Sequence, residues 1–151
     1  MINRRAIAER REEQETRAVY RLADALYAPY SCPATAECCQ LTRTRRQPWL
    51  WPSEWRVLRE GVLKTHGVVP LSRPDGACPL LDATGKHCTV YANRPFGCRT
   101  FFCHRIRGPS QQPVIAMNGL LERLERINQR EDDELPAEPL QLLEWFAREQ
   151  T

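Results

Sequence analysis

The stretch that decides the fold of this chain is GACPLLDATGKHCTVYANRPFGCRTFFCH, residues 76–104. It contains four of the seven cysteines and two of the three histidines. The other cysteines lie together upstream, at Cys32, Cys38 and Cys39. Isolated buried thiols would be spread more evenly along the chain, so the two clusters predict two halves of one metal site.

The first half of this stretch has the pattern of a β-hairpin. Two short β-prone segments, residues 77–81 and 87–91, flank a five-residue loop at residues 82–86. Gly85 lies in that loop and can adopt the positive φ that such turns require. We therefore expect an antiparallel pair of strands here.

The register of this hairpin decides whether its cysteines converge. In a hairpin symmetric about the loop, Leu80 lies opposite Cys88. Cys78 then lies opposite Val90, and the two cysteines are diagonal neighbours on one face. A shift of one residue sends Cys88 to the other face. The expectation of two sulfurs directed at one ion depends on this register.

A helix is expected after the hairpin. Asn93 is a good N-cap, and Pro95 suits the first turn. Cys98 then lies near a helix N-terminus, where backbone N–H groups favour the thiolate over the thiol. Cys103 and His104 follow after about one and a half turns. This arrangement can bring a third and a fourth ligand back over the hairpin.

The remaining segments have the patterns of helices. Apolar residues recur at helical spacing in residues 2–28 and 114–130, Ser53 begins a helix through about His66, and a last short helix starts near Pro139. A length of 151 residues with 42% hydrophobic content predicts one domain. We expect a small helix-rich α+β fold, spanning residues 1–151, with a helical N-terminal arm (1–28), a cysteine-cluster core (30–107) and C-terminal helices (113–150).

The cellular compartment bears on the chemistry of the thiols. No segment approaches the roughly 20 apolar residues that span a bilayer, and the first residues are charged without the apolar run of a secretory signal. We expect a cytoplasmic protein without a membrane partner, in which thiols stay reduced. Seven cysteines also cannot all pair. Metal or cluster ligation is favoured over a disulfide framework.

The charge pattern argues against a nucleic-acid partner. The net charge of +3 is mild, and the basic residues are scattered along the chain. One local run, residues 43–51, combines three arginines with Trp49 and Trp51. These side chains could stack on bases or phosphates. A surface loop whose tryptophans pack onto the core is the favoured interpretation.

Common catalytic motifs are absent from the sequence. It has no Gly-rich phosphate loop, no Gly-x-Ser-x-Gly and no His-Glu-x-x-His. His87 precedes Cys88 and His104 follows Cys103, but neighbours in sequence rarely have the geometry of a base and a nucleophile. A cysteine protease is not indicated.

Four motifs follow one another in a fixed order. They are Cys32 with Cys38-Cys39, then Cys78-Pro-Leu-Leu-Asp, then Cys88-Thr-Val-Tyr, then Asn93-Arg-Pro-Phe-Gly-Cys-Arg99. Over roughly residues 30–104 this order resembles the bacterial YkgJ-type cysteine-cluster family, described as a zinc- or iron-chelating domain. The resemblance implies seven metal ligands: Cys32, Cys38, Cys39, Cys78, Cys88, Cys98 and Cys103. It also implies that Tyr91, Arg94, Pro95 and Arg99 support those ligands.

The chain departs from the family pattern in one respect. Family members often place another cysteine between the first one and the Cys-Cys pair, but residues 33–37 contain none. A site that needs eight ligands must therefore recruit a histidine. His104 is the best placed, followed by His87.

The resemblance implies a protein that chelates zinc or iron for metal handling or sensing. Two alternatives stay open. Because the family includes a domain of flagellin lysine N-methylases, one is an iron–sulfur or iron-dependent enzyme acting on a protein side chain. The other is an interaction module that zinc stabilises for a protein partner. Seven thiols exceed the four that one zinc ion or one cubane cluster needs, which predicts several ions or spare thiols, with zinc favoured. The sequence does not decide the oligomeric state.

Overall fold

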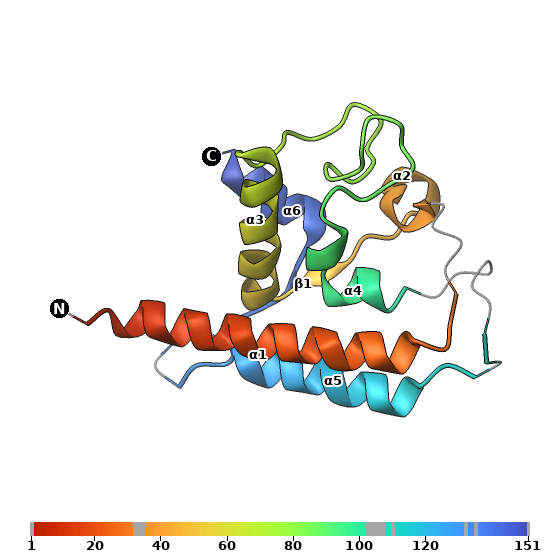
Figure 1. Cartoon of the computed structure of the whole chain (residues 1–151). Helices are drawn as coiled ribbons and strands as arrows, with labels where there is room; N and C mark the ends of the chain where they lie inside the picture. The colour runs from red at the N-terminus through yellow and green to blue at the C-terminus, as the bar shows by residue number, and fades with distance from the viewer. Residues whose placement is uncertain are drawn as a thin grey trace.

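The computed structural model describes residues 2–31, 36–101, 108–109, 111–131, 133–134 and 136–150. A long helix, α1 (Arg4–Tyr27), runs along one side of the molecule, and α5 (Val114–Asn128) lies antiparallel beside it (Figure 1). The helix α3 (Pro52–His66) stands across this pair. The C-terminal helix α6 (Leu142–Glu149) packs on α3 through Trp145 and Phe146, whose rings both contact Trp55.

The predicted long helices are confirmed, with small changes at their ends. Asn3 caps α1 by accepting a hydrogen bond from the backbone N–H of Ala6 (3.1 Å), and the helix ends just before Pro29. The last turn of α3 ends at Gly67, whose φ of 76° is the left-handed conformation that glycine adopts easily. No helix in the described part of the chain is both long and apolar enough to cross a membrane.

The start of α3 differs from the prediction. Trp51, not Ser53, is the N-cap, and Pro52 occupies the first position of the helix. Ser53 is instead fully buried, where its hydroxyl accepts hydrogen bonds from Thr16 (2.7 Å) and from the Asn128 amide (2.9 Å). The Ser53 side chain, which the sequence suggested as the N-cap, therefore belongs to a polar network that joins α1, α3 and α5.

Two apolar clusters lie on different faces of α3. We call the first the helical core, because it joins α1, α3, α5 and the short helix α4 (Phe96–Arg99): Val19, Tyr20, Ala23, Val57, Phe96, Leu120 and Leu124. We call the second the cysteine core, because it joins α3 and α6 to the cysteine segments: Cys39, Leu41, Leu50, Trp55, Leu58, Val62, Ala77, Cys78, Leu80, Leu81, Val90, Leu142 and Phe146. Helix α3 thus holds both halves of the molecule together.

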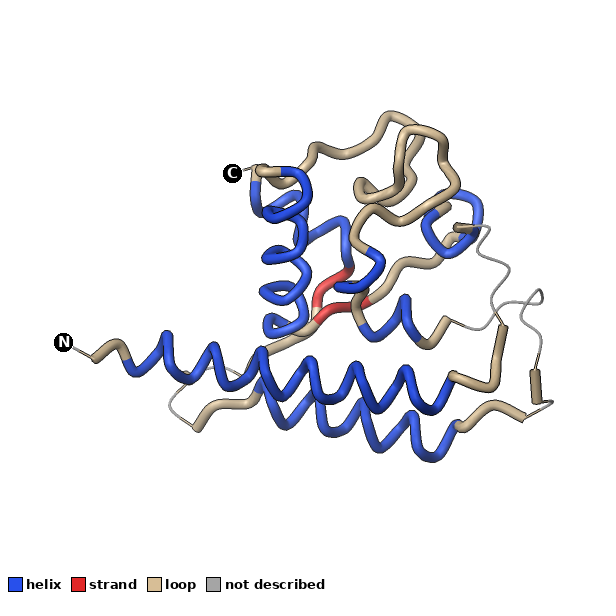
Figure 2. The backbone as a smooth tube through the Cα atoms, viewed as in Figure 1, coloured by secondary structure: helices blue, strands red, loops and turns tan. Residues whose placement is uncertain are grey.

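The regular β-structure is small and lies away from the predicted hairpin. β1 (Trp49–Leu50) and β2 (Leu140–Gln141) pair antiparallel, with Trp49 opposite Gln141 and Leu50 opposite Leu140 (Figure 2). This pairing brings the C-terminal segment against the entrance to α3. The helix-rich α+β class is therefore confirmed, although its strands join segments far apart in sequence.

The predicted register of the hairpin is wrong by one residue. A single antiparallel bridge joins Leu81, not Leu80, to Cys88. The loop between the paired residues has six residues, 82–87, rather than five, and the N–H of Asp82 donates to the carbonyl oxygen of His87 across it (2.8 Å). A turn precedes the bridge, in which the N–H of Leu81 donates to the carbonyl oxygen of Cys78 (3.1 Å). Cys78 therefore lies in a turn rather than a strand. The positive φ expected of Gly85 is confirmed, at 74°.

The helix expected from Asn93 begins later. The 3₁₀ turn η2 (Tyr91–Asn93) comes first, and α4 (Phe96–Arg99) follows Pro95. The Asn93 side chain packs against Gly61 of α3, where an added Cβ would lie only 2.5 Å from the Asn93 Cγ. Its amide donates to the carbonyl oxygen of Val57 (3.4 Å). Asn93 therefore attaches this segment to α3 instead of capping α4.

Candidate metal centre

Every cysteine in the described part of the chain lines one cavity of about 210 Å³. These residues are Cys38, Cys39, Cys78, Cys88 and Cys98. Apolar side chains such as Leu58 and Leu80 form much of the wall, and Lys86, His87 and Arg94 also line it. Cys32, Cys103 and His104 lie outside the described residues. The structure therefore brings five of the seven predicted ligands to one place.

Short local elements deliver these thiols. The 3₁₀ turn η1 (Glu37–Cys39) carries the adjacent pair, and the short helix α2 (Leu41–Thr44) follows it. The N–H of Cys78 donates to the carbonyl oxygen of Cys39 at 2.8 Å. This backbone hydrogen bond joins the upstream cluster directly to the downstream one, so convergence does not depend on a regular hairpin.

Cys39 is the centre of a hydrogen-bonded group of thiols. Its side chain is within hydrogen-bonding reach of Cys38, Cys78 and Cys88. The hydrogen bond from Cys39 lowers the pKa of Cys38 and that of Cys88 to about 7. The same bonds raise the pKa of Cys39, because its proton is shared among neighbouring sulfurs. Cys38 and Cys88 therefore ionise before Cys39.

The pKa of Cys98 is raised, whereas the sequence predicted that a helix N-terminus would favour its thiolate. Cys98 lies in α4, but this helix has four residues and a correspondingly weak N-terminal field. Burial raises the pKa of Cys98 well above its ordinary value, and nearby thiols add to the effect. The side chain faces cavities, which leaves part of its surface accessible. Desolvation, rather than the helix terminus, dominates at this thiol.

Arg94 is a positive charge close to the described thiols. Its charge lowers the pKa of Cys38, of Cys88 and of Cys98, as a secondary effect in each case. The guanidinium lies 3.7 Å from the centre of the Tyr91 ring and donates to the carbonyl oxygen of Cys98 (3.2 Å). The motif resemblance assigned Arg94 and Tyr91 a supporting role, and the structure shows the contacts that would perform it.

A buried carboxylate, which the sequence did not single out, holds α4 in place. Glu54 is 1% exposed and accepts hydrogen bonds from the Tyr20 hydroxyl (3.0 Å), the Phe96 N–H (2.9 Å) and the Trp51 N–H (3.0 Å). Burial raises the pKa of Glu54, although these three donors oppose the shift. The one sequence signal for Glu54 was its place three residues after the N-cap Trp51.

Arg99 fixes the other end of the same helix. It donates to the carbonyl oxygens of Arg94 (2.7 Å) and Ala92 (2.5 Å) and pairs with Asp24 of α1 (2.8 Å). Its guanidinium also stacks over the Tyr20 ring at 4.4 Å. Cys98 is thereby held between two anchored residues, Phe96 and Arg99.

The comparison with protein families agrees with this arrangement. A family model named CxxCxxCC and described as "Putative zinc- or iron-chelating domain" matches residues 31–119. The chain belongs to the CxxCxxCC family. The matched segment contains all seven cysteines, and the resemblance noted from the motifs is confirmed. Searches among curated proteins and among solved structures found no match.

The described CxxCxxCC thiols are gathered, but they do not form a preformed ligand shell. Among the described residues, no three or more His, Cys, Asp or Glu side chains are arranged to hold a metal ion directly. The thiols are instead hydrogen-bonded to one another. Their chemistry nevertheless fits zinc or iron, because both metals bind thiolates in proteins. Binding would replace shared protons with a metal ion.

The histidines have distinct positions. His87 lines the thiol cavity, although it is exposed. His66 lies in the last turn of α3, as expected for a residue that complements the helix dipole, and its Nε2 lies 2.9 Å from the Thr89 Oγ1. Of the two histidines in the described part of the chain, His87 lines the thiol cavity and His66 does not.

Proposed function

We propose that this chain binds zinc or iron through the thiolates of its cysteine cluster, for metal handling or sensing. The ligand set is Cys32, Cys38, Cys39, Cys78, Cys88, Cys98 and Cys103. The observation that carries the proposal is the convergence of all five described cysteines on one cavity. Membership of a family described as metal-chelating supports it.

The surroundings of the cavity suit a cluster of negative ligands. Each thiolate that binds a metal adds a negative charge, and several thiolates exceed the charge of one divalent ion. Arg94 and Lys86 line the same cavity and can offset this excess. Cys39 must lose its shared proton for the site to bind, so metal uptake releases protons. A bound metal would be held by sulfur, with its chemistry set by which metal is present.

The proposal is tested by metal analysis together with an absorption spectrum on protein purified without oxygen. We expect at least one equivalent of zinc or iron per chain, and zinc in protein purified in air. A brown protein with little zinc, absorbing near roughly 400 nm, would instead indicate an iron–sulfur centre. Folded protein with all thiols reduced and no bound metal, even after zinc and iron are supplied, would contradict the proposal.

A further inference from the structure

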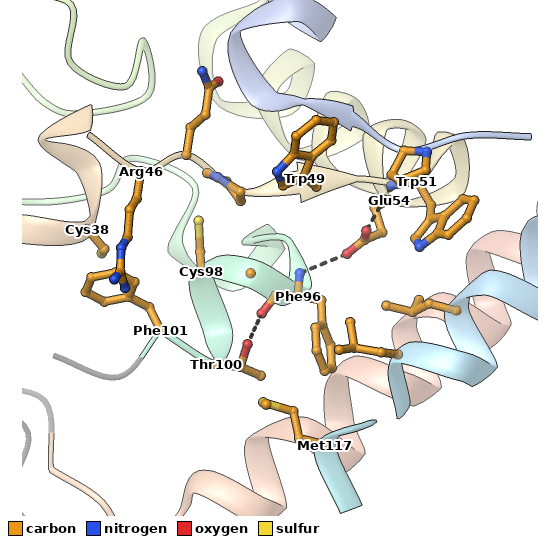
Figure 3. Close-up of a pocket in the computed structure, with 16 residues that line it drawn as sticks. Cys38, Arg46, Trp49, Trp51, Glu54, Phe96, Cys98, Thr100, Phe101 and Met117 are labelled. Carbon is orange, nitrogen blue, oxygen red and sulfur yellow. Dashed lines mark hydrogen bonds between the residues drawn. The ribbon is translucent and has the colours of Figure 1, made fainter. Parts of the chain in front are cut away.

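A second and larger cavity adjoins the thiol cavity. It has a volume of about 460 Å³ and lies between the β1 segment, α4 and α5 (Figure 3). Cys38 and Cys98 line both cavities, so they form the shared wall. Small-molecule pockets in proteins typically measure about 300–1,000 Å³. The second cavity therefore has the size of a ligand site rather than of a packing defect.

The walls of this pocket are mostly apolar and aromatic. Trp49 and Trp51 lie on one side of it and Met117 lies opposite, while Phe101 is near the end where Cys38 is found (Figure 3). Trp51 packs against the helical core, as expected for the tryptophans of this segment, but Trp49 stays 57% exposed. An exposed tryptophan at the rim of an apolar pocket is typical of a binding surface.

Among the described residues that line the pocket, two are charged, and only one of them has a charge without a partner. The Glu54 carboxylate is buried and already accepts three hydrogen bonds. The Arg46 side chain is exposed, and within the described part of the chain no hydrogen bond or ion pair engages its guanidinium. Arg43 and Arg45 lie close by in sequence. The pocket therefore presents one positive charge without a partner among the described residues, that of Arg46, beside apolar walls.

We propose that this pocket binds an organic anion, a carboxylate on an apolar body. Arg46 would pair with the carboxylate, since guanidinium and carboxylate form charge-assisted hydrogen bonds. Trp49, Phe101 and Met117 would contact the apolar part. The proposal goes beyond metal binding, because the pocket exists whichever metal the thiols hold. Its position makes the ligand a neighbour of the metal site, through Cys38 and Cys98.

The test compares three probes of one chain length on the metal-loaded protein: decanoate, decanol and decylamine. Binding is measured by calorimetry and by the fluorescence of the tryptophans. Decanoate should bind saturably with one site per chain. Decanol should bind roughly five- to tenfold more weakly, because it lacks the charge that Arg46 pairs with, and decylamine should bind more weakly still.

Matched variants locate the binding. Arg46→Gln should weaken decanoate to the level of decanol and leave decanol unchanged. Arg43→Gln, at another exposed arginine that does not line the pocket, should change neither. Leu121→Trp, at a 41% exposed lining position, should fill the pocket and weaken both probes.

Three outcomes would overturn the proposal: equal binding of the three probes, equal effects of Arg46→Gln and Arg43→Gln, or no saturable binding. Parallel metal analysis separates this proposal from the metal function. If the protein takes up no metal when zinc and iron are supplied but still binds decanoate, only the metal proposal is overturned. If the protein has its full metal content but does not bind decanoate, only the ligand proposal is overturned.

Discussion

The two cores on either side of α3 are stabilised by different means. The helical core joins long elements whose apolar periodicity already specifies them, and it has a buried ion network at its edge. Glu12 pairs with Arg130 (2.6 Å) and with Arg56 (2.5 Å), which ties α1 to α5 and α3. The cysteine core has few regular elements. Residues 67–90 contain no helix and a single β-bridge.

This difference between the two cores indicates which of them a bound metal ion would stabilise. Segments without regular secondary structure have few backbone hydrogen bonds to order them. Contacts between side chains must therefore supply the remaining stabilisation. In the cysteine core those constraints are thiols that share protons and can exchange them for a metal. In the helical core they are packed apolar side chains and ion pairs. We therefore expect the two cores to respond separately to metal removal, mutation and pH.

The largest expected effect is that of metal removal on the cysteine core. Chelation of the loaded protein should cost at least about 3 kcal/mol of stability, since metal-binding free energy is also folding free energy. For a chain of this length that lowers the Tm by about 10 °C. Hydrogen exchange should accelerate in residues 77–98 before it does so in α1.

A chelator also acts on unrelated proteins and on the buffer. The control is re-addition of zinc to the chelated protein, which should restore both the Tm and the exchange protection. An unchanged Tm after verified metal loss would show that the cysteine core needs no metal. Equal acceleration of exchange in both cores would show that they are not separate.

The second effect is the loss of single thiolates. Cys78→Ser, Cys88→Ser and Cys98→Ser should each lose most of the bound metal, because the remaining ligands cannot close the site. We expect Cys32→Ser or Cys39→Ser to be milder if the adjacent pair includes a thiol that does not bind metal. Metal per chain is measured by elemental analysis.

The matched control for these variants is Thr89→Ser, which shortens the side chain next to Cys88 and keeps the hydroxyl that donates to the carbonyl oxygen of Leu80. It should retain full metal content. A Cys88→Ser protein that also retained full metal content would remove Cys88 from the ligand set.

These two cores also differ in how well the sequence predicts them. The helical core follows from periodicity, and α1, α3 and α5 appear close to their expected bounds. The cysteine core was predicted through a hairpin symmetric about a five-residue loop, and there a six-residue loop shifted the register by one residue. Short strands carry little periodicity, so local turn chemistry decides their pairing.

The sequence predicted which residues gather at the site better than it predicted the pKa shifts of those residues. The cysteine spacing and the motif order indicated which thiols gather, and five of them do line one cavity. The sequence could not indicate that burial raises the pKa of Cys98 or that Glu54 holds α4. Both depend on long-range packing of α1, α3 and α4, which no local pattern encodes.

A third and smaller effect should appear in the helical core. Glu12→Gln removes the carboxylate shared by Arg56 and Arg130, and breaking a largely buried pair costs about 2–3 kcal/mol when the arginines retain some solvent. The Tm should fall, while metal content should stay at the level of the unmodified protein. Arg5→Gln is the control, because its pair with Glu9 is exposed and should matter little. Metal loss in Glu12→Gln would show that the two cores are coupled.

The smallest expected effect is a difference in pH dependence between two buried glutamates. At Glu12, desolvation is outweighed by Arg130 and Arg56, and the net result is a lowered pKa. Its contribution to stability is therefore present above the unfolded-state pKa and is lost as the pH falls through the folded-state pKa. At Glu54, burial raises the pKa. Its contribution is present below the unfolded-state pKa and is lost as the pH rises through the raised, folded-state pKa.

The two variants Glu12→Gln and Glu54→Gln should therefore change the pH profile of the Tm in opposite senses. Relative to the unmodified protein, the destabilisation caused by Glu12→Gln should shrink as the pH falls from about 7 to about 4. The destabilisation caused by Glu54→Gln should instead grow over the same interval. As the pH falls, Glu54 of the unmodified protein becomes protonated, and the free-energy cost of burying its charge disappears. The comparison uses protein of equal metal content at each pH, so that thiol titration affects all samples alike. Parallel profiles for the two variants would show that the opposite environments of these carboxylates do not control stability.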